Sequence, residues 1–118
     1  MNEPKKIVRK DGTRYYLNGK LHREDGPAVE YPDGTKSWYL NGKLHRTDGP
    51  AIEYANGTKC WWVDGKRHRT DGPALEHANG DKEWLVNDKE ITTKTAKKFM
   101  NCYPELVDQF LAYEALNR

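Results

Sequence analysis

The chain has 118 residues, of which 36% are hydrophobic and 32% are charged, and its mean hydropathy is -1.06. This length allows one domain, or one repeat array with a small appendage. Apolar runs span only a few residues, which excludes a membrane-spanning helix and makes a secretory signal unexpected. Because only Cys60 and Cys102 are present and no export signal is expected, we predict reduced thiols and a cytoplasmic location.

The dominant feature along the chain is an internal repeat. The segment IVRKDGTRYY from Ile7 looks like a partial unit, and three 23-residue units then begin at Leu17, Leu40 and Val63. A last partial unit, VNDKEI, ends at Ile91. The sequence therefore predicts a repeat array over residues 1–91 with about three and a half 23-residue units. Residues that recur at this spacing include His22, His45 and His68; Pro27, Pro50 and Pro73; and Trp38, Trp61 and Trp84.

Each unit carries turn signals at both of its ends. Asn41-Gly42 and its equivalents predict tight type I′ hairpins, because both central residues of that turn need positive φ. Asp33-Gly34 and its equivalents mark a second hairpin, and the segments between the turns are short and alternate in polarity. The expected fold is mainly β, a single-layer antiparallel meander of β-hairpin repeats with about two strands in each unit.

Alternation along the strands assigns side chains to the two faces of this sheet. The repeated tryptophans share one side of their strands, and we join that side to the one that holds the repeated aliphatic residues. This combined face is expected to be the buried one. Its residues are Trp38, Trp61 and Trp84 with Val29, Ile52 and Leu75.

The opposite face carries a ladder of Tyr16, Tyr39, Trp62 and Leu85, which is a candidate binding surface. The alternative is that these side chains only stabilise the sheet through cross-strand pairs. The third unit also has Arg67 where the second has a leucine, and Trp and Arg are frequent binding hot spots. We therefore add Arg67 to the candidate binding residues and expect Trp62 to be the most important of them.

Residues 92–118 lack glycine and β alternation, which predicts a small C-terminal helical cap. Thr93 can cap a short helix, and Pro104 fits the first turn of a second helix. An apolar stripe on that second helix would cover the open edge and apolar end of the array. The alternative is a helix that binds a partner, so a homo-oligomer through this helix or through the sheet edge stays open. The stripe is formed by Leu106, Val107, Phe110, Leu111 and Tyr113.

The most conspicuous motif is His-Arg-x-Asp-Gly-Pro-Ala. Its repeated His and Asp suggest a ladder of metal sites, but each unit supplies only one of each, about 10 Å from the next. Zinc ligands lie about 2 Å from one ion. We therefore expect no metal and no other cofactor, and we interpret each His–Asp pair as a hydrogen-bonded structural clamp. The pairs are His22 with Asp25, His45 with Asp48, and His68 with Asp71.

The sequence has no Gly-rich phosphate loop, Cys-x-x-Cys pair or serine-nucleophile elbow, so we expect a protein that is not an enzyme. Basic residues recur beside aromatic ones, as in proteins that bind single-stranded nucleic acid. Acidic residues recur as well, however, and the net charge is only +2. We favour cross-strand ion pairs and keep single-stranded nucleic acid as an alternative ligand.

The unit resembles a variant of the membrane occupation and recognition nexus (MORN) repeat, in the Asn-Gly turns and the aromatic residues beside them over most of residues 6–91. That resemblance implies a binding or scaffolding module. The His22–Ala28 segment and its equivalents are similar instead to repeats of uncharacterised proteins of tailed bacteriophages. This second likeness implies a phage-encoded accessory protein in the host cytoplasm, with a protein partner such as a host or antiviral defence factor that it inhibits. A weaker likeness to choline- and glucan-binding hairpin repeats is discounted, because no secretion signal is expected here and this chain is far more charged. The aromatic ladder alone leaves a carbohydrate or cell-wall ligand as a second alternative.

Overall fold

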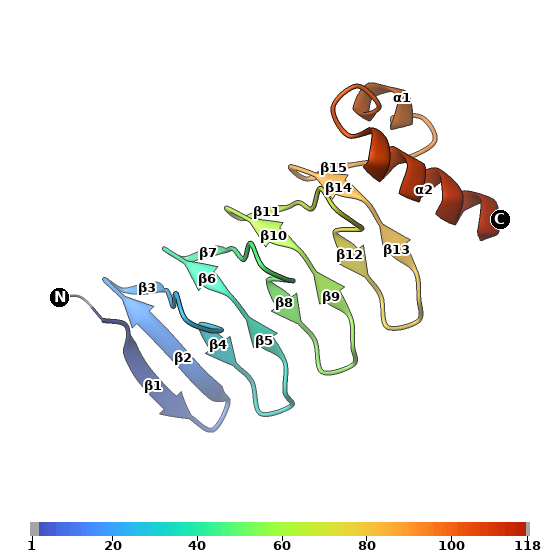
Figure 1. Cartoon of the computed structure of the whole chain (residues 1–118). Helices are drawn as coiled ribbons and strands as arrows, with labels where there is room; N and C mark the ends of the chain where they lie inside the picture. Colours follow the sequence, from blue (N-terminus) through green and yellow to red (C-terminus); the bar gives the residue numbers. More distant parts are fainter. Residues whose placement is uncertain (1–2, 118) are drawn as a thin grey trace.

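The computed structural model describes residues 3–117, and it shows hairpins stacked along one direction with two helices at the C-terminal end (Figure 1). The molecule is elongated and measures 47 × 29 × 18 Å. The expected mainly β, antiparallel meander with a helical cap is confirmed. Residues 1, 2 and 118 of the predicted array and cap lie outside the described residues. The elements are β1 (Lys5–Arg9), β2 (Gly12–Leu17), β3 (Lys20–Leu21), β4 (Val29–Glu30), β5 (Lys36–Ser37), β6 (Tyr39–Leu40), β7 (Lys43–Leu44), β8 (Ile52–Glu53), β9 (Lys59–Cys60), β10 (Trp62–Val63), β11 (Lys66–Arg67), β12 (Leu75–Glu76), β13 (Lys82–Glu83), β14 (Leu85–Val86), β15 (Lys89–Glu90), α1 (Ala96–Phe99) and α2 (Pro104–Leu116).

The main sheet has nine strands in the order β1-β2-β4-β5-β8-β9-β12-β13, with β3 also paired to β2. Every pair is antiparallel, and each 23-residue unit adds one hairpin to the sheet. In the β4–β5 hairpin Val29 lies opposite Ser37, and Ser37 lies in turn opposite Ile52 of the next unit. Successive units are thus joined by backbone pairing as well as by side chains.

Each unit contains a second hairpin outside the main sheet, formed by β6–β7, β10–β11 or β14–β15. The chain changes partners at Trp38, whose N–H donates to the Ala51 carbonyl (2.7 Å) and whose carbonyl accepts from the His45 N–H (3.0 Å). Each full unit therefore has four short strands rather than the two that the sequence predicted. At the tip, Asn41 has φ 51° and Gly42 has φ 80°, the two positive angles that a type I′ turn requires.

The turns at the other end of the units are wider than the Asp-Gly and Asn-Gly letters suggested. In the first, only Gly34 has positive φ, at 96°. The Asp33 carboxylate accepts a hydrogen bond from the Thr35 N–H (2.9 Å), and the Tyr31 N–H donates to the Thr35 carbonyl (2.9 Å). This arrangement is an Asx turn, in which the side chain completes the loop. The loop that it closes spans residues 31–35, between β4 and β5.

The predicted assignment of the two faces is wrong because of this loop length. Val29 pairs with Ser37 and Glu30 pairs with Lys36, so Trp38 lies on the side of Glu30 and not on the side of Val29. The face that holds Val29 also holds Ser37 and Tyr39, so it is the face of the predicted binding ladder. The sequence shows which residues alternate within one strand. The length of the loop decides which residues of the next strand share a face with them.

The C-terminal helices pack on the last unit. Leu106, Val107 and Phe110 of α2 are buried in one cluster with Trp84. The Lys82 N–H, at the outer edge of the main sheet, donates to the Tyr113 hydroxyl (3.2 Å). The predicted apolar stripe is therefore largely used to close the array, although Leu111 stays 43% exposed. Over residues 3–117, neither helix has the length and apolar character needed to cross a membrane.

Candidate functional site: a face of repeated grooves

One face of the main sheet carries aromatic residues separated by alanines. The strand register places Ala51 between Trp38 and Trp61, since Ile52 lies between Ser37 and Cys60. The alanines of this row are completely buried, so a larger side chain has no room there. With strands about 4.8 Å apart, the aromatic rings recur about every 10 Å. In chain order the row is Tyr15, Ala28, Trp38, Ala51, Trp61, Ala74 and Trp84.

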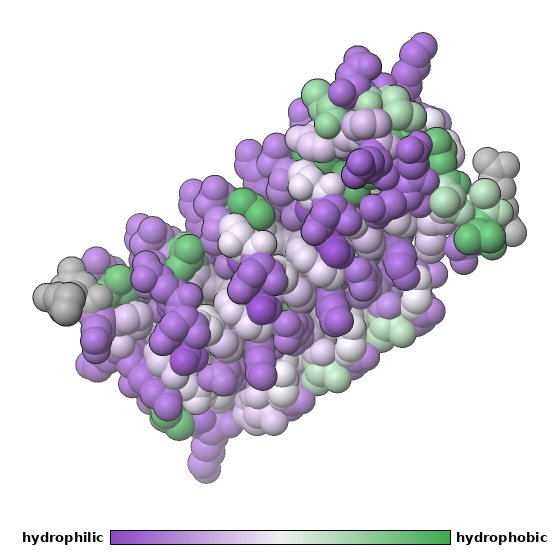
Figure 2. Space-filling model, in the orientation of Figure 1, coloured by the Kyte–Doolittle hydropathy of each residue, from purple (hydrophilic) through white to green (hydrophobic). Residues whose placement is uncertain are grey.

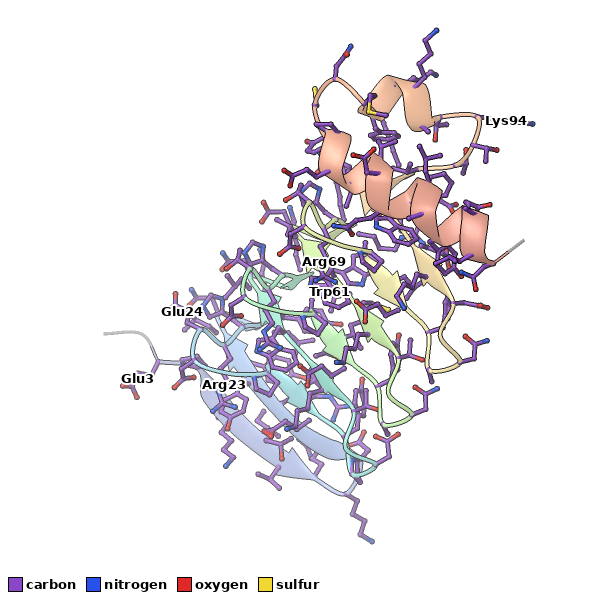
Figure 3. All side chains as sticks on the ribbon, turned by 45° about the vertical axis from the view of Figure 1, so that its right-hand side comes forward. Glu3, Arg23, Glu24, Trp61, Arg69 and Lys94 are labelled. Carbon is purple, nitrogen blue, oxygen red and sulfur yellow. The ribbon has the colours of Figure 1, made fainter. Side chains whose placement is uncertain are left out.

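An arginine stacks on each of the first three aromatic rings. The Arg46 guanidinium carbon lies 3.8 Å from the centre of the Trp38 ring, and Arg69 lies 4.0 Å from Trp61. Arg23 covers Tyr15 in the same way at 4.0 Å. Figure 3 shows Arg69 beside Trp61 in the middle of the array. These cation–π contacts give each aromatic side chain a polar cover from the unit that follows it.

The loop after each arginine holds the guanidinium in place. Arg46 donates from Nε to the Asp48 carboxylate (2.8 Å), and from a terminal nitrogen to the Pro50 carbonyl (3.1 Å) and to Glu53 (2.9 Å). The equivalent bonds of Arg69 measure 2.7, 3.0 and 3.0 Å. Gly49 leaves room for this guanidinium, since a Cβ there would lie 2.9 Å from the Arg46 guanidinium carbon and would displace the side chain. The His-Arg-x-Asp-Gly-Pro motif is therefore a platform for an arginine.

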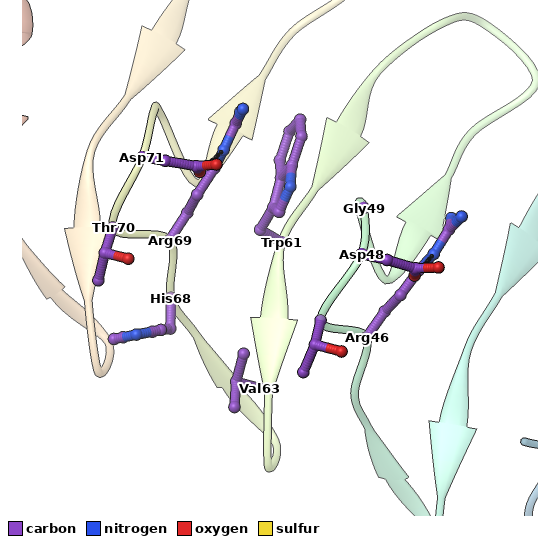
Figure 4. A pocket seen from close by; sticks show the side chains of 10 residues that line it. Arg46, Asp48, Gly49, Trp61, Val63, His68, Arg69, Thr70 and Asp71 are labelled. Atoms are coloured by element: carbon purple, nitrogen blue, oxygen red, sulfur yellow. Dashed lines mark hydrogen bonds and ion pairs between the residues drawn. The ribbon is translucent and has the colours of Figure 1, made fainter.

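Between the arginine loop and the aromatic ring of the same unit lies an open groove. The groove at Trp61 has a volume of about 560 Å³, and the groove one unit earlier, at Trp38, has about the same volume. Figure 4 shows Trp61 between the Arg46–Asp48 pair and the Arg69–Asp71 pair. Val63 and His68 complete the lining of this groove, together with Thr47, Gly49 and Thr70.

The grooves present carboxylates rather than free cations. The guanidinium of Arg46 is already bonded to two carboxylates, whereas the Asp48 side chain is 84% exposed at the rim. The hydrogen bond from Arg46 lowers the pKa of Asp48 below its usual value, and Arg69 does the same for Asp71. Both carboxylates are therefore ionised at neutral pH, which disfavours a phosphate at the groove.

In the last unit α2 covers the surface that is open in the earlier ones. Trp84, Val86 and Ile91 stand one repeat after Trp61, Val63 and His68, and all three belong to the buried cluster with α2. Gly72 and Pro73 are buried there, whereas their equivalents one and two units earlier are only half-buried. Figure 2 shows a largely hydrophilic surface along the array, with hydrophobic side chains gathered around the C-terminal helices. The same repeat position is thus an open groove twice and a helix-covered surface once.

The predicted His–Asp clamps are wrong in their partners. His22 Nδ1 accepts a hydrogen bond from the Asn41 N–H of the next hairpin (2.9 Å), while Asp25 accepts from Arg23 (2.9 Å). The other units repeat this arrangement. Each histidine joins neighbouring units and each aspartate orients an arginine, because the loop directs the two side chains apart. In those units His45 and His68 accept from Asp64 and Asn87, and Asp48 and Asp71 accept from Arg46 and Arg69.

The predicted binding ladder lies on the face opposite the grooves. Tyr16, Tyr39 and Trp62 are half-buried there, and burial raises the pKa of Tyr39. Leu85 is only 2% exposed, so its assignment as a contact residue is wrong. Both residues of β14, next to the helices, are buried, whereas the equivalent residues of β6 and β10 are half-buried.

Trp62 and Arg67 are brought together as opposite residues of the β10–β11 hairpin. The Trp62 indole nitrogen is buried without a hydrogen-bond partner among the described residues. Arg67 is bound to Asp88 of the next hairpin, through its backbone N–H at 2.8 Å and its Nε at 3.5 Å. Arg67 therefore helps to join two hairpins, in addition to any contact with a ligand.

Sequence reasoning missed the arginine–aromatic stacks and the grooves beside them. The arginines were visible only as rows of charge, and the aromatic rings were assigned to a closed core. The available signal was the constant spacing of eight residues from Tyr15 to Arg23, from Trp38 to Arg46 and from Trp61 to Arg69. The same spacing from Trp84 leads to Thr92, where the arginine is replaced and α2 takes over.

No protein-family model, no curated protein and no solved structure matches this chain. Within residues 3–117, three or more His, Cys, Asp or Glu side chains nowhere gather in a way that would hold a metal ion.

Proposed function

We propose that this protein is a non-enzymatic repeat module that binds another protein through its face of grooves. The observation that carries the proposal is the last unit, where a polypeptide helix of the chain itself lies on the surface equivalent to the grooves. Trp84 contacts Phe110 at 6.0 Å and Tyr113 at 5.2 Å between ring centres. A surface that accepts one helix is a reasonable binding surface for a second one at the earlier positions.

The charges of the grooves favour a protein over a nucleic acid. The arginines beside the rings are already paired, and the ionised carboxylates of Asp48 and Asp71 stand at the rim. A single-stranded nucleic acid needs free cations along its backbone and free ring faces for its bases. Each of the first three rings instead has one face covered by an arginine. Nucleic acid therefore remains a less favoured ligand, and so does a carbohydrate that stacks on these rings.

The likeness of the HRxDGPA segments to phage repeats adds an expectation about the partner. It favours a protein of a bacterial host, including a component of an antiviral defence system that this chain would inhibit. The likeness therefore guides the choice of lysate for the experiment.

The experiment compares two positions of a photo-reactive amino acid in the full chain. Thr47 is exposed and lines both open grooves, whereas Ala55 is exposed in the turn at the far end of its hairpin. We expect p-benzoylphenylalanine at Thr47 to give one discrete protein adduct in a bacterial lysate, and the same group at Ala55 to give none. Equal adducts at both positions, or no adduct at Thr47, would contradict binding at the grooves. Salt-sensitive binding of a single-stranded oligonucleotide would support the nucleic-acid alternative.

A further inference from the structure

A glutamine of α2 makes the most specific contact on the helix-covered surface. The Trp84 indole N–H donates to Gln109 Oε1 (3.3 Å), and Gln109 Nε2 donates to the main-chain carbonyl of Asp71 (3.4 Å). A carboxamide offers a donor and an acceptor on one planar group. Gln109 thus bridges the aromatic ring and the arginine loop of the last full unit.

The same two groups recur in the open grooves. One repeat earlier they are the Trp61 indole N–H and the Asp48 carbonyl, and two repeats earlier they are the equivalent groups of Trp38 and Asp25. Among the hydrogen bonds of residues 3–117, neither the Trp61 indole nor the Asp48 carbonyl has a partner. The open grooves therefore hold, at equivalent repeat positions, the donor and the acceptor that a carboxamide bridges in the last unit.

The lining of the open grooves is more polar than the covered surface, since Arg69 stands where the last unit has Thr92. His68 stands where Ile91 stands in the last unit, and it lines the groove at Trp61. Its Nδ1 accepts from the Asn87 N–H (3.0 Å), so a neutral ring carries its proton on Nε2. This further donor suits a ligand that is more polar than α2, with fewer aliphatic side chains than Leu106 and Val107 supply in the last unit.

We infer that the open grooves at Trp38 and Trp61 bind an α-helix of a partner protein that inserts a glutamine side chain between the indole N–H and the main-chain carbonyl. The inference rests on the proposed protein-binding function and adds the chemistry of the ligand. An aromatic residue follows this glutamine on the partner helix, as Phe110 and Tyr113 follow Gln109 in α2. Basic side chains near the glutamine are favoured, because exposed carboxylates of Asp48 and Asp71 flank the groove.

The test uses the full chain and a labelled helical peptide with the sequence of residues 101–117. Asp108 and Ala112 are exposed on α2 and one turn apart, so a hydrocarbon staple between them holds the peptide helical without touching the contact side. Binding is measured by fluorescence anisotropy. We expect the peptide with Gln109→Leu or Gln109→Glu to bind at least about tenfold more weakly than the parent peptide, because the groove's donor or acceptor is then left without a partner.

A second arm locates the binding on the protein. Thr47→Trp fills the mouths of the two open grooves and does not touch Trp84, so we expect it to weaken peptide binding at least about tenfold. Ala55→Trp is the matched control and should bind normally, and thermal unfolding confirms that both variants are folded. Unchanged binding to Thr47→Trp would mean that the peptide replaces α2 instead, which would overturn the inference. Equal binding of the parent and Gln109→Leu peptides, or no binding of any peptide, would overturn it too.

The two experiments fail in different ways. If Thr47 with the photo-reactive group captures a protein and the peptides do not bind, then the grooves bind a protein by other chemistry. If neither experiment shows binding at Thr47, then the proposed function itself is wrong.

Discussion

The inner units and the last unit use the same sheet position in opposite ways. In the inner units Trp61 is half-buried under Arg69, and the space beside it is open to solvent. In the last unit Trp84 is only 3% exposed, under the aromatic side chains of α2. The arginine is a sufficient cover where another unit follows and completes the sheet. Among the described residues β13 is the edge strand of the main sheet at this end, and a helix supplies both an apolar cover and a hydrogen-bond acceptor for that edge.

The difference between the last unit and the inner units is tested most directly by removing the aromatic ring from each, at Trp84 and at Trp61. We expect Trp84→Ala to lower the free energy of unfolding by ~3–5 kcal/mol, the usual loss for a buried aromatic residue. Trp61→Ala should cost about half as much, because one side of this ring already faces a groove. Urea unfolding of both variants measures the difference. Equal losses would mean that the helix and the arginine cover their rings equally well.

Removing the arginine cover should have a smaller effect. Arg46→Ala loses the stack on Trp38 and the bond to the Pro50 carbonyl, and we expect a loss of ~1–2 kcal/mol of unfolding free energy. Arg46→Lys keeps the charge but not the planar fork, so it should recover less than half of that loss. The same urea measurement serves here, with Lys43→Ala, an exposed residue of the same hairpin, as the control. Full recovery with lysine would show that charge alone matters.

The hairpin tips should show a loss of about the same or smaller size. Gly42 has φ 80°, and alanine resists a positive angle, so we expect Gly42→Ala to cost ~1 kcal/mol. Its Cβ would lie no closer than 3.6 Å to Lys20, so the cost reflects the backbone and not a clash. Thermal unfolding measures the effect, and replacement by D-alanine in a synthetic chain should restore stability. No recovery with D-alanine would point to packing as the cause.

The arginine loops should also make the fold sensitive to acid. Hydrogen bonds from Arg46 and Arg69 lower the pKa values of Asp48 and Asp71 in the folded chain. A lowered carboxyl pKa stabilises the fold at pH above the unfolded value of about 3.9, and this contribution is lost as the pH falls through the folded value. We expect the Asp48→Asn, Asp71→Asn double variant to lose less stability between pH 5 and pH 2 than the parent. Identical pH profiles would show that these pairs do not stabilise the fold.

The two cysteines should differ in reactivity and report on the two regions without perturbing them. Burial raises the pKa of Cys60 in the array to about 11, whereas Cys102 lies exposed between the helices. Because the thiolate is the reactive form, we expect iodoacetamide at pH 7.5 to modify Cys102 and to leave Cys60 intact in the folded protein. Mass spectrometry counts the modified thiols, and denaturant should make both react. Rapid modification of Cys60 in the folded chain would mean that the array opens.

Part of the candidate site could be predicted from the sequence. The motif around Arg46 and Asp48 was recognised as structural, and its repetition was clear. Its contacts were assigned incorrectly because His45 and Asp48 are close in sequence, whereas the structure joins His45 to the next unit. A repeat invites the assumption that each unit completes its own contacts. In this array the hydrogen bonds of His22, His45 and His68 cross from one unit to the next.

The sequence by itself determined the 23-residue period and the positive-φ turns at Asn41-Gly42 and its equivalents. It also determined the change from strands to helices after the array and the start of the second helix at Pro104. These features depend on local backbone preferences, which the residue types express directly. Only the tertiary structure decided which residues share a face and which rings stay open to solvent. The reason is physical: the loop of residues 31–35 sets the register between β4 and β5, and one residue more or less would exchange the faces. The covering of Trp84 depends likewise on α2, whose contacts come from 25 or more residues further along the chain.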